Sequence, residues 1–76
     1  MTPFEKLKDI AEQMGGDFCA FYSGRGMSGR TCAGIVTDDP MICIELAAQR
    51  GITGATFDSM GRQTIVYWPR ITEDSV

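Results

Sequence analysis

Residues 17–37 read DFCAFYSGRGMSGRTCAGIVT and contain two strand-like segments with a polar loop between them. Along residues 17–22, Phe18, Ala20 and Tyr22 are expected on one face, and Cys19 and Phe21 on the other. Residues 31–37 form the second apolar segment. The simplest pairing is an antiparallel hairpin with an unusually long, glycine-rich tip at residues 23–30.

A helix is predicted on each side of this hairpin. Thr2-Pro3-Phe4-Glu5 has the pattern of a capping box, and Gly15-Gly16 ends the helix that follows. Asp39 is expected to cap a second helix that starts at Pro40 and ends at Gly51. Because residues 41–44 are apolar nearly all round, the second helix is expected to be the more deeply buried.

Residues 53–58 and 63–68 predict a second hairpin, which residues 59–62 join and Pro69 ends. The expected fold is therefore α+β, in the order α-β-β-α-β-β, with two helices on one face of a four-stranded antiparallel sheet. Residues 1–70 are expected to form one domain, and residues 71–76 a flexible acidic tail. A chain of 76 residues has a thin core, so a homodimer or higher oligomer is an open possibility.

Composition excludes several classes of function. The net charge of −3 disfavours binding to long nucleic acids. The absence of histidine removes the commonest general base and metal ligand, so we expect no catalysis, metal or cofactor. The three cysteines form no C-x-x-C pair and favour a reduced, cytoplasmic protein without a membrane segment, with a Cys19–Cys32 disulfide as the minor alternative.

The glycine loop at residues 23–30 has the composition of an anion-binding loop. Glycine lets backbone N–H groups approach a ligand, and arginine adds a planar fork of donors. The loop is neither a Walker A motif nor a convincing dinucleotide fingerprint, because a strand follows it. The candidate ligand-binding residues, from this loop and from the similar loop at 58–62, are Ser23, Gly24, Arg25, Gly26, Met27, Ser28, Gly29, Arg30, Asp58, Ser59, Met60, Gly61 and Arg62.

The alternative for each loop is a plain turn with solvated arginines. Tight binding of a phosphate-bearing ligand would also need base stacking, which Tyr22, Tyr67 or Trp68 could supply unless they simply pack in the sheet. Met27 and Met60 would close over a ligand, contribute to an interface, or pack back on the core.

The segments Tyr22–Cys32 (with SGRGMSGRTC), Asp58–Gly61 (DSMG) and Thr64–Pro69 (TIVYWP) resemble a group of small uncharacterised proteins of bacteriophages and prophages. The resemblance covers residues 18–70 and implies a counter-defence setting in the cytoplasm of a host cell. The leading hypothesis is a non-catalytic protein that captures a nucleotide or cyclic nucleotide signal. The alternative is a protein–protein inhibitor of a host defence complex, of the anti-CRISPR kind, which acts through its acidic helical face or its Met-bearing loops.

Overall fold

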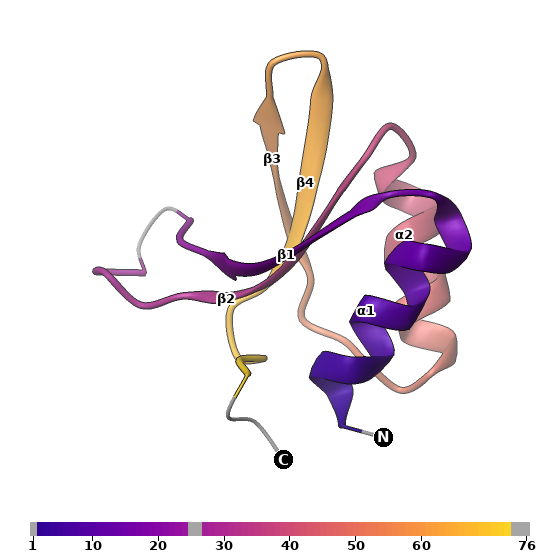
Figure 1. The fold of residues 1–76 in the computed structure, drawn as a ribbon, viewed down its shortest axis with the longest axis horizontal. Helices are drawn as coiled ribbons and strands as arrows, with labels where there is room; N and C mark the ends of the chain where they lie inside the picture. The colour runs from indigo at the N-terminus through magenta and orange to yellow at the C-terminus, as the bar shows by residue number, and fades with distance from the viewer. Residues whose placement is uncertain (1, 25–26, 74–76) are drawn as a thin grey trace.

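The computed structural model describes residues 2–24 and 27–73. Its elements follow the predicted order α-β-β-α-β-β (Figure 1). The bounds are α1 (Pro3–Met14), β1 (Asp17–Tyr22), β2 (Cys32–Thr37), α2 (Pro40–Gln49), β3 (Thr56–Met60) and β4 (Gln63–Trp68). The predicted ends of β1 and β4 are confirmed to the residue.

The four strands form one antiparallel sheet in the order β1-β2-β4-β3. Both helices pack against the same face of this sheet, which confirms the predicted two-layer architecture. The core between the layers combines Leu7, Ile10 and Ala11 of α1 and Cys43 and Ala47 of α2 with Ala33, Ile35, Val66 and Trp68 of the sheet. Alternate residues of β2 and β4 point to the opposite face and build a second, smaller cluster there.

The signals at the helix ends are mostly confirmed. Thr2 and Glu5 form the capping box, and the hydrogen bonds from Thr2 hold the pKa of Glu5 below its usual value. Gly15 and Gly51 adopt left-handed φ angles of 72° and 81°, and the chain leaves each helix there through bonds to its last carbonyls. Asp39 occupies the cap position of α2 without a side-chain cap bond; its own N–H donates to Thr37 Oγ1 at 3.0 Å.

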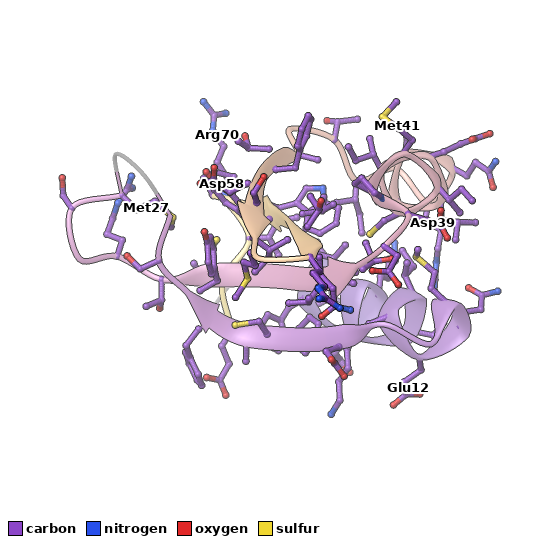
Figure 2. The ribbon with its side chains drawn as sticks, turned by 90° about the horizontal axis from the view of Figure 1, so that it is seen from above. Glu12, Met27, Asp39, Met41, Asp58 and Arg70 are labelled. Carbon is purple, nitrogen blue, oxygen red and sulfur yellow. The ribbon has the colours of Figure 1, made fainter. Side chains whose placement is uncertain are left out.

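The expectation that α2 is the more deeply buried helix is wrong. Met41 and Ile42 are largely exposed, and Met41 projects outward from α2 (Figure 2). In a two-layer fold a helix buries one stripe against the sheet, so an apolar run that surrounds the helix leaves part of itself in solvent.

Two details of the strands also differ from the prediction. β3 begins at Thr56, not at residue 53, and continues through Met60, which pairs with Gln63 across a two-residue turn. In β1 the register shifts between Cys19 and Tyr22, so that Tyr22 pairs with Cys32. This extra residue places Tyr22 beside Cys19 in the smaller cluster, not on the face of Phe18 as the simple alternation predicts.

The start of the predicted tail belongs to the compact part of the chain. Ile71 N–H donates to Trp68 O at 2.9 Å, and Ile71 O accepts from Ala33 N–H at 2.8 Å. The Ile71 side chain packs against the main core. The boundary predicted after residue 70 therefore comes too early.

Candidate functional site

The side chain of Met27 folds back from the glycine loop onto the sheet. It is 2% exposed and packs with Cys32, Ile65 and Tyr67 on the face opposite the helices. Gly24 N–H donates to Met27 Sδ at 3.1 Å, and Met27 N–H donates to Gly24 O at 3.3 Å. Of the roles left open for Met27, the structure selects the one in which it packs on the core.

The rest of the described loop is a tight turn. Ser28 and Gly29 both have positive φ angles, 51° and 83°, and Arg30 N–H donates to Met27 O at 3.0 Å. This is the pattern of a type I′ turn. The Arg30 side chain bonds the same carbonyl through Nε at 3.2 Å. The backbone N–H and the side-chain Nε–H of Arg30 are thus both hydrogen-bonded within the described loop.

Gly24 is needed for internal packing. A Cβ atom at this position would lie 2.7 Å from Tyr67 Cζ, which is too close for any side chain. The loop backbone therefore approaches a tyrosine ring, where the sequence suggests approach to an anion. Ser23 adjoins Gly24 in the described loop, whereas Arg25 and Gly26 lie outside the described residues.

The two glycine-containing loops lie at opposite ends of the sheet. β1, β2, β4 and β3 alternate in direction, so the loop after β1 lies beside the end of β4, whereas the turn at Gly61 and Arg62 lies at its beginning (Figure 1). Asp58, Ser59 and Met60 belong to β3 itself. The described residues of the two loops therefore do not form one site.

The face opposite the helices also carries two tyrosines, whose rings contact each other at an interplanar angle of 51°. The rings of Tyr22 and Tyr67 lie 4.8 Å apart between centroids. Burial raises the pKa of Tyr22, and the nearby charge of Asp58 raises it further. The side chains of the smaller cluster cover this part of the sheet, and their packing stabilises the hairpin of β1 and β2.

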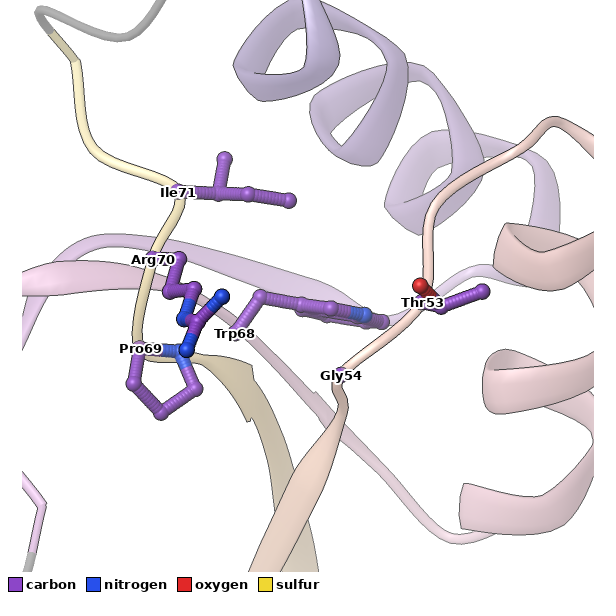
Figure 3. Close-up of a pocket in the computed structure, with 6 residues that line it drawn as sticks. All are labelled: Thr53, Gly54, Trp68, Pro69, Arg70 and Ile71. Carbon is purple, nitrogen blue, oxygen red and sulfur yellow. The ribbon is translucent and has the colours of Figure 1, made fainter.

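A surface cavity lies instead beyond the end of β4. It encloses about 330 Å³ and is lined by Thr53, Gly54, Trp68, Pro69, Arg70 and Ile71 (Figure 3). The chain reaches it from two sides: residues 52–55 lead from α2 into β3, and Trp68–Ile71 form a turn closed by the bond between Ile71 N–H and Trp68 O. Proline at the second position favours such a turn.

The indole of Trp68 supplies a buried hydrogen-bond donor at this cavity. Trp68 is 1% exposed, and its Nε1 has no hydrogen-bond partner among the described residues. In Figure 3 the nitrogen lies at the edge of the indole nearest Thr53. A buried donor without a partner costs about 1–3 kcal/mol, so an acceptor that reached it would be stabilising.

The described lining of the cavity offers an apolar floor and hydrogen-bond donors and carries no negative charge. Ile71 and Pro69 contribute apolar surface, and among the described lining residues the charged group is the guanidinium of Arg70, which also has an interaction of its own. Since the indole N–H and the guanidinium only donate, the cavity favours a ligand that carries acceptor atoms and negative charge.

The residues of this cavity were largely missed by the sequence interpretation, which named Trp68 as a stacking residue and none of its neighbours. The sequence signal that could have indicated this site is the run Trp68-Pro69-Arg70. A proline that favours a turn lies here between an aromatic residue and an arginine.

Two of the three cysteines, Cys32 and Cys43, are buried and poorly placed to react. Cys19, Cys32 and Cys43 are free thiols, and burial raises the pKa of Cys32 and brings that of Cys43 to about 11. A buried thiol with a raised pKa is a poor nucleophile at neutral pH. Throughout residues 2–24 and 27–73, no cluster of three or more metal-ligating side chains occurs, and no helix has the length and apolar character to cross a bilayer.

The hollow on the acidic face of α1 is a weaker candidate. Glu5, Lys8, Asp9 and Glu12 line it, and it is open to solvent. Asp9 forms an ion pair with Arg50 at 2.8 Å between Oδ2 and Nη1.

Comparison of the chain with protein families, with characterised proteins and with solved structures finds no match, so the cavity beside Trp68 is assigned on its chemistry alone.

Proposed function

We propose that this protein binds a small phosphate-bearing ligand, a mononucleotide or cyclic mononucleotide, in the cavity beside Trp68, without transforming it. The observation that carries the proposal is the buried Nε1 of Trp68, which has no hydrogen-bond partner in the described part of the chain, in a cavity whose described lining includes the Arg70 guanidinium as its charged group. The indole N–H donates a hydrogen bond to an acceptor on the base, and a phosphate pairs with the guanidinium.

The size of the cavity limits the ligand. Ligand cavities typically enclose about 300–1,000 Å³, and the present one, at about 330 Å³, is at the lower end. One base with its sugar and phosphate suits this volume better than two. Among the nucleotide signals that the sequence left open, we therefore favour mononucleotides over cyclic dinucleotides.

The expected affinity is moderate. A charge-assisted hydrogen bond contributes about 1.5–3 kcal/mol, and the bond to the buried indole relieves about 1–3 kcal/mol. Together these barely exceed the minimum of about 4 kcal/mol that association costs in rigid-body freedom. Contact with Ile71 and Pro69 has to supply the remainder, so inorganic phosphate alone is expected to bind weakly.

The single tryptophan of the chain makes the test direct. The full chain would be titrated with nucleoside monophosphates, cyclic mononucleotides, cyclic dinucleotides and inorganic phosphate, and the fluorescence of Trp68 recorded with the heat of binding. A saturable change with a mononucleotide is the expected result. Absence of both heat and fluorescence change with every compound would refute the proposal.

Arginine variants locate the site. Arg70→Ala is expected to weaken binding about tenfold or more, the effect of about 1.4 kcal/mol. Arg62→Ala removes the same charge at the far end of β4 and is expected to leave binding unchanged. If Arg25→Ala with Arg30→Ala abolished binding while Arg70→Ala did not, the ligand would belong to the glycine loop.

The resemblance to phage and prophage proteins gives the binding a setting: capture of a nucleotide signal of host defence in the host cytoplasm. Failure of every titration would favour the alternative, inhibition of a host protein. Met27 is an unsuitable contact for such an inhibitor because its side chain is buried.

A further inference from the structure

β3 forms a regular edge of the sheet, and its one charged residue is Asp58. Among the described strands it pairs with β4 alone, and all five of its residues do so without a register shift. β1, at the other edge, is interrupted by the shift between Cys19 and Tyr22. Lysine, proline and bulges commonly protect edge strands from pairing, and β3 contains none of them.

The side chains of β3 add an apolar anchor to this edge. Phe57 pairs with Val66 and so belongs to the face that the helices cover, yet it is 57% exposed. The hairpin of β3 and β4 extends beyond the helices, as Figure 1 shows. On the other face Thr56 is exposed and Asp58 is half-buried, one on each side of Phe57 along the strand.

We propose that two copies of this chain pair through their β3 edges, antiparallel, with Phe57 opposite Phe57 of the second copy. The two rings then contact each other on one face. On the other face, Asp58 of each copy lies opposite Thr56 of its partner, so that a hydroxyl donates to a carboxylate twice. The two sheets become one continuous sheet of eight strands.

The charge pattern of the strand selects this register. A two-fold axis through Asp58 would set two carboxylates directly opposite, which is destabilising in a strand pair. An axis at Thr56 would shorten the overlap, because Gly54 has a left-handed φ of 85° and lies outside the strand. Axes at Phe57 and at Ser59 both avoid opposed carboxylates and keep three strand residues in register, and of these two the axis at Phe57 brings the exposed phenylalanine rings together.

A second copy suits this edge better than an unrelated strand. The match of Phe57 with itself and of Asp58 with Thr56 is self-complementary, as a two-fold interface requires. A chain of 76 residues also has a small core of its own, so additional burial at an edge contributes a large share of its stability.

Sedimentation velocity on the full chain over a range of concentrations tests the association. The expected species has twice the 8.3 kDa mass of the chain. Phe57→Lys is expected to raise the dissociation constant about tenfold or more. Phe21→Lys is the matched control, because Phe21 is 64% exposed on the opposite edge strand, and it is expected to leave the dimer intact. Far-UV circular dichroism of each variant confirms that it folds.

A single species of monomer mass at concentrations up to about 1 mM, the weak limit of specific association, would overturn the proposal. Equal loss of the dimer in Phe21→Lys and Phe57→Lys would overturn it as well, since β3 would then not be the contact.

Oxidative cross-linking tests the register. Phe57→Cys places two thiols opposite each other at the axis and is expected to yield a covalent dimer on a non-reducing gel. In Ser59→Cys the two thiols are about 13 Å apart along the strands, so no dimer above the wild-type background is expected. Equal cross-linking of the two variants would contradict the register. The mass and cross-linking of the dimer are measured separately from ligand titration of the cavity beside Trp68, so failure of one proposal is distinguishable from failure of the other.

Discussion

Met27 and Met60 have similar sequence surroundings, each beside Ser and Gly in a hairpin, but the fold gives them different environments. Met27 is 2% exposed and accepts a hydrogen bond from Gly24 N–H, whereas Met60 is 48% exposed at the end of β3. Local sequence does not determine this difference. It arises because the longer loop can fold over the cluster of Cys32, Ile65 and Tyr67, while the two-residue turn after Met60 cannot.

The free energy of unfolding should separate the two methionines. Met27→Ala leaves a cavity under the loop and is expected to destabilise the chain by about 2–3 kcal/mol. Met60→Ala, at a largely exposed site, is expected to cost about 0.5 kcal/mol or less. Urea unfolding measures both. Met27→Leu, which conserves volume, should recover most of the loss; similar losses for Met27→Ala and Met60→Ala would contradict the packing described.

At the scale of the element, α2 is half buried, and its buried stripe includes a thiol. Cys43 faces the core from the first turns of α2 and is inaccessible to solvent, while Met41 and Ile42 beside it are exposed. Burial brings the pKa of Cys43 from 9.0 to about 11, because a thiolate in the core would lose its hydration.

This raised pKa predicts a loss of stability in alkali. Below pH 9 the thiol is neutral in both states and the contribution of Cys43 is constant. Between pH 9 and about 11 it ionises in the unfolded chain but not in the folded one, so the unfolding free energy falls by up to about 1.4 kcal/mol per pH unit. Urea unfolding at a series of pH values should show a steeper fall for the wild type than for Cys43→Ala. Parallel curves would contradict the prediction.

For the molecule as a whole, the segment after β4 closes the core and builds the cavity. Ile71 bonds to the end of β4 and to the start of β2, and its side chain lies both against the core and in the cavity lining. Stability and the proposed binding site therefore share the same turn, whose last residue, Ile71, the sequence pattern assigns to a flexible tail.

Shortening Ile71 tests this assignment. Ile71→Ala is expected to destabilise the chain by about 1–2 kcal/mol, less than a fully buried isoleucine because Ile71 is half-buried. Glu73→Ala, at an exposed position of the same segment, should change the unfolding free energy by about 0.5 kcal/mol or less. Thermal unfolding of both variants decides the matter: if neither change lowers the midpoint, the compact domain does end at residue 70.

The sequence alone determined the elements and the class of fold. The capping box at Thr2 and Glu5, the glycines at the helix ends and Pro69 at the end of β4 are local signals, in which each residue acts on its immediate neighbours along the chain. The order of these elements left few compact arrangements, and a sheet with two helices on one face is among the simplest.

Only the tertiary structure decided where the candidate binding site lies. Whether the two hairpin tips meet depends on the strand order β1-β2-β4-β3, which sets them at opposite ends. The register shift in β1 and the inward turn of Met27 depend on packing against β2 and β4, and so escape a pattern read along one strand. The cavity is lined by Thr53, which precedes the β3–β4 hairpin, and by Arg70, which follows it. Trp68 Nε1 lacks a hydrogen-bond partner among the described residues because of how these segments pack around it, since hydrogen bonds join groups that are close in space and not in sequence.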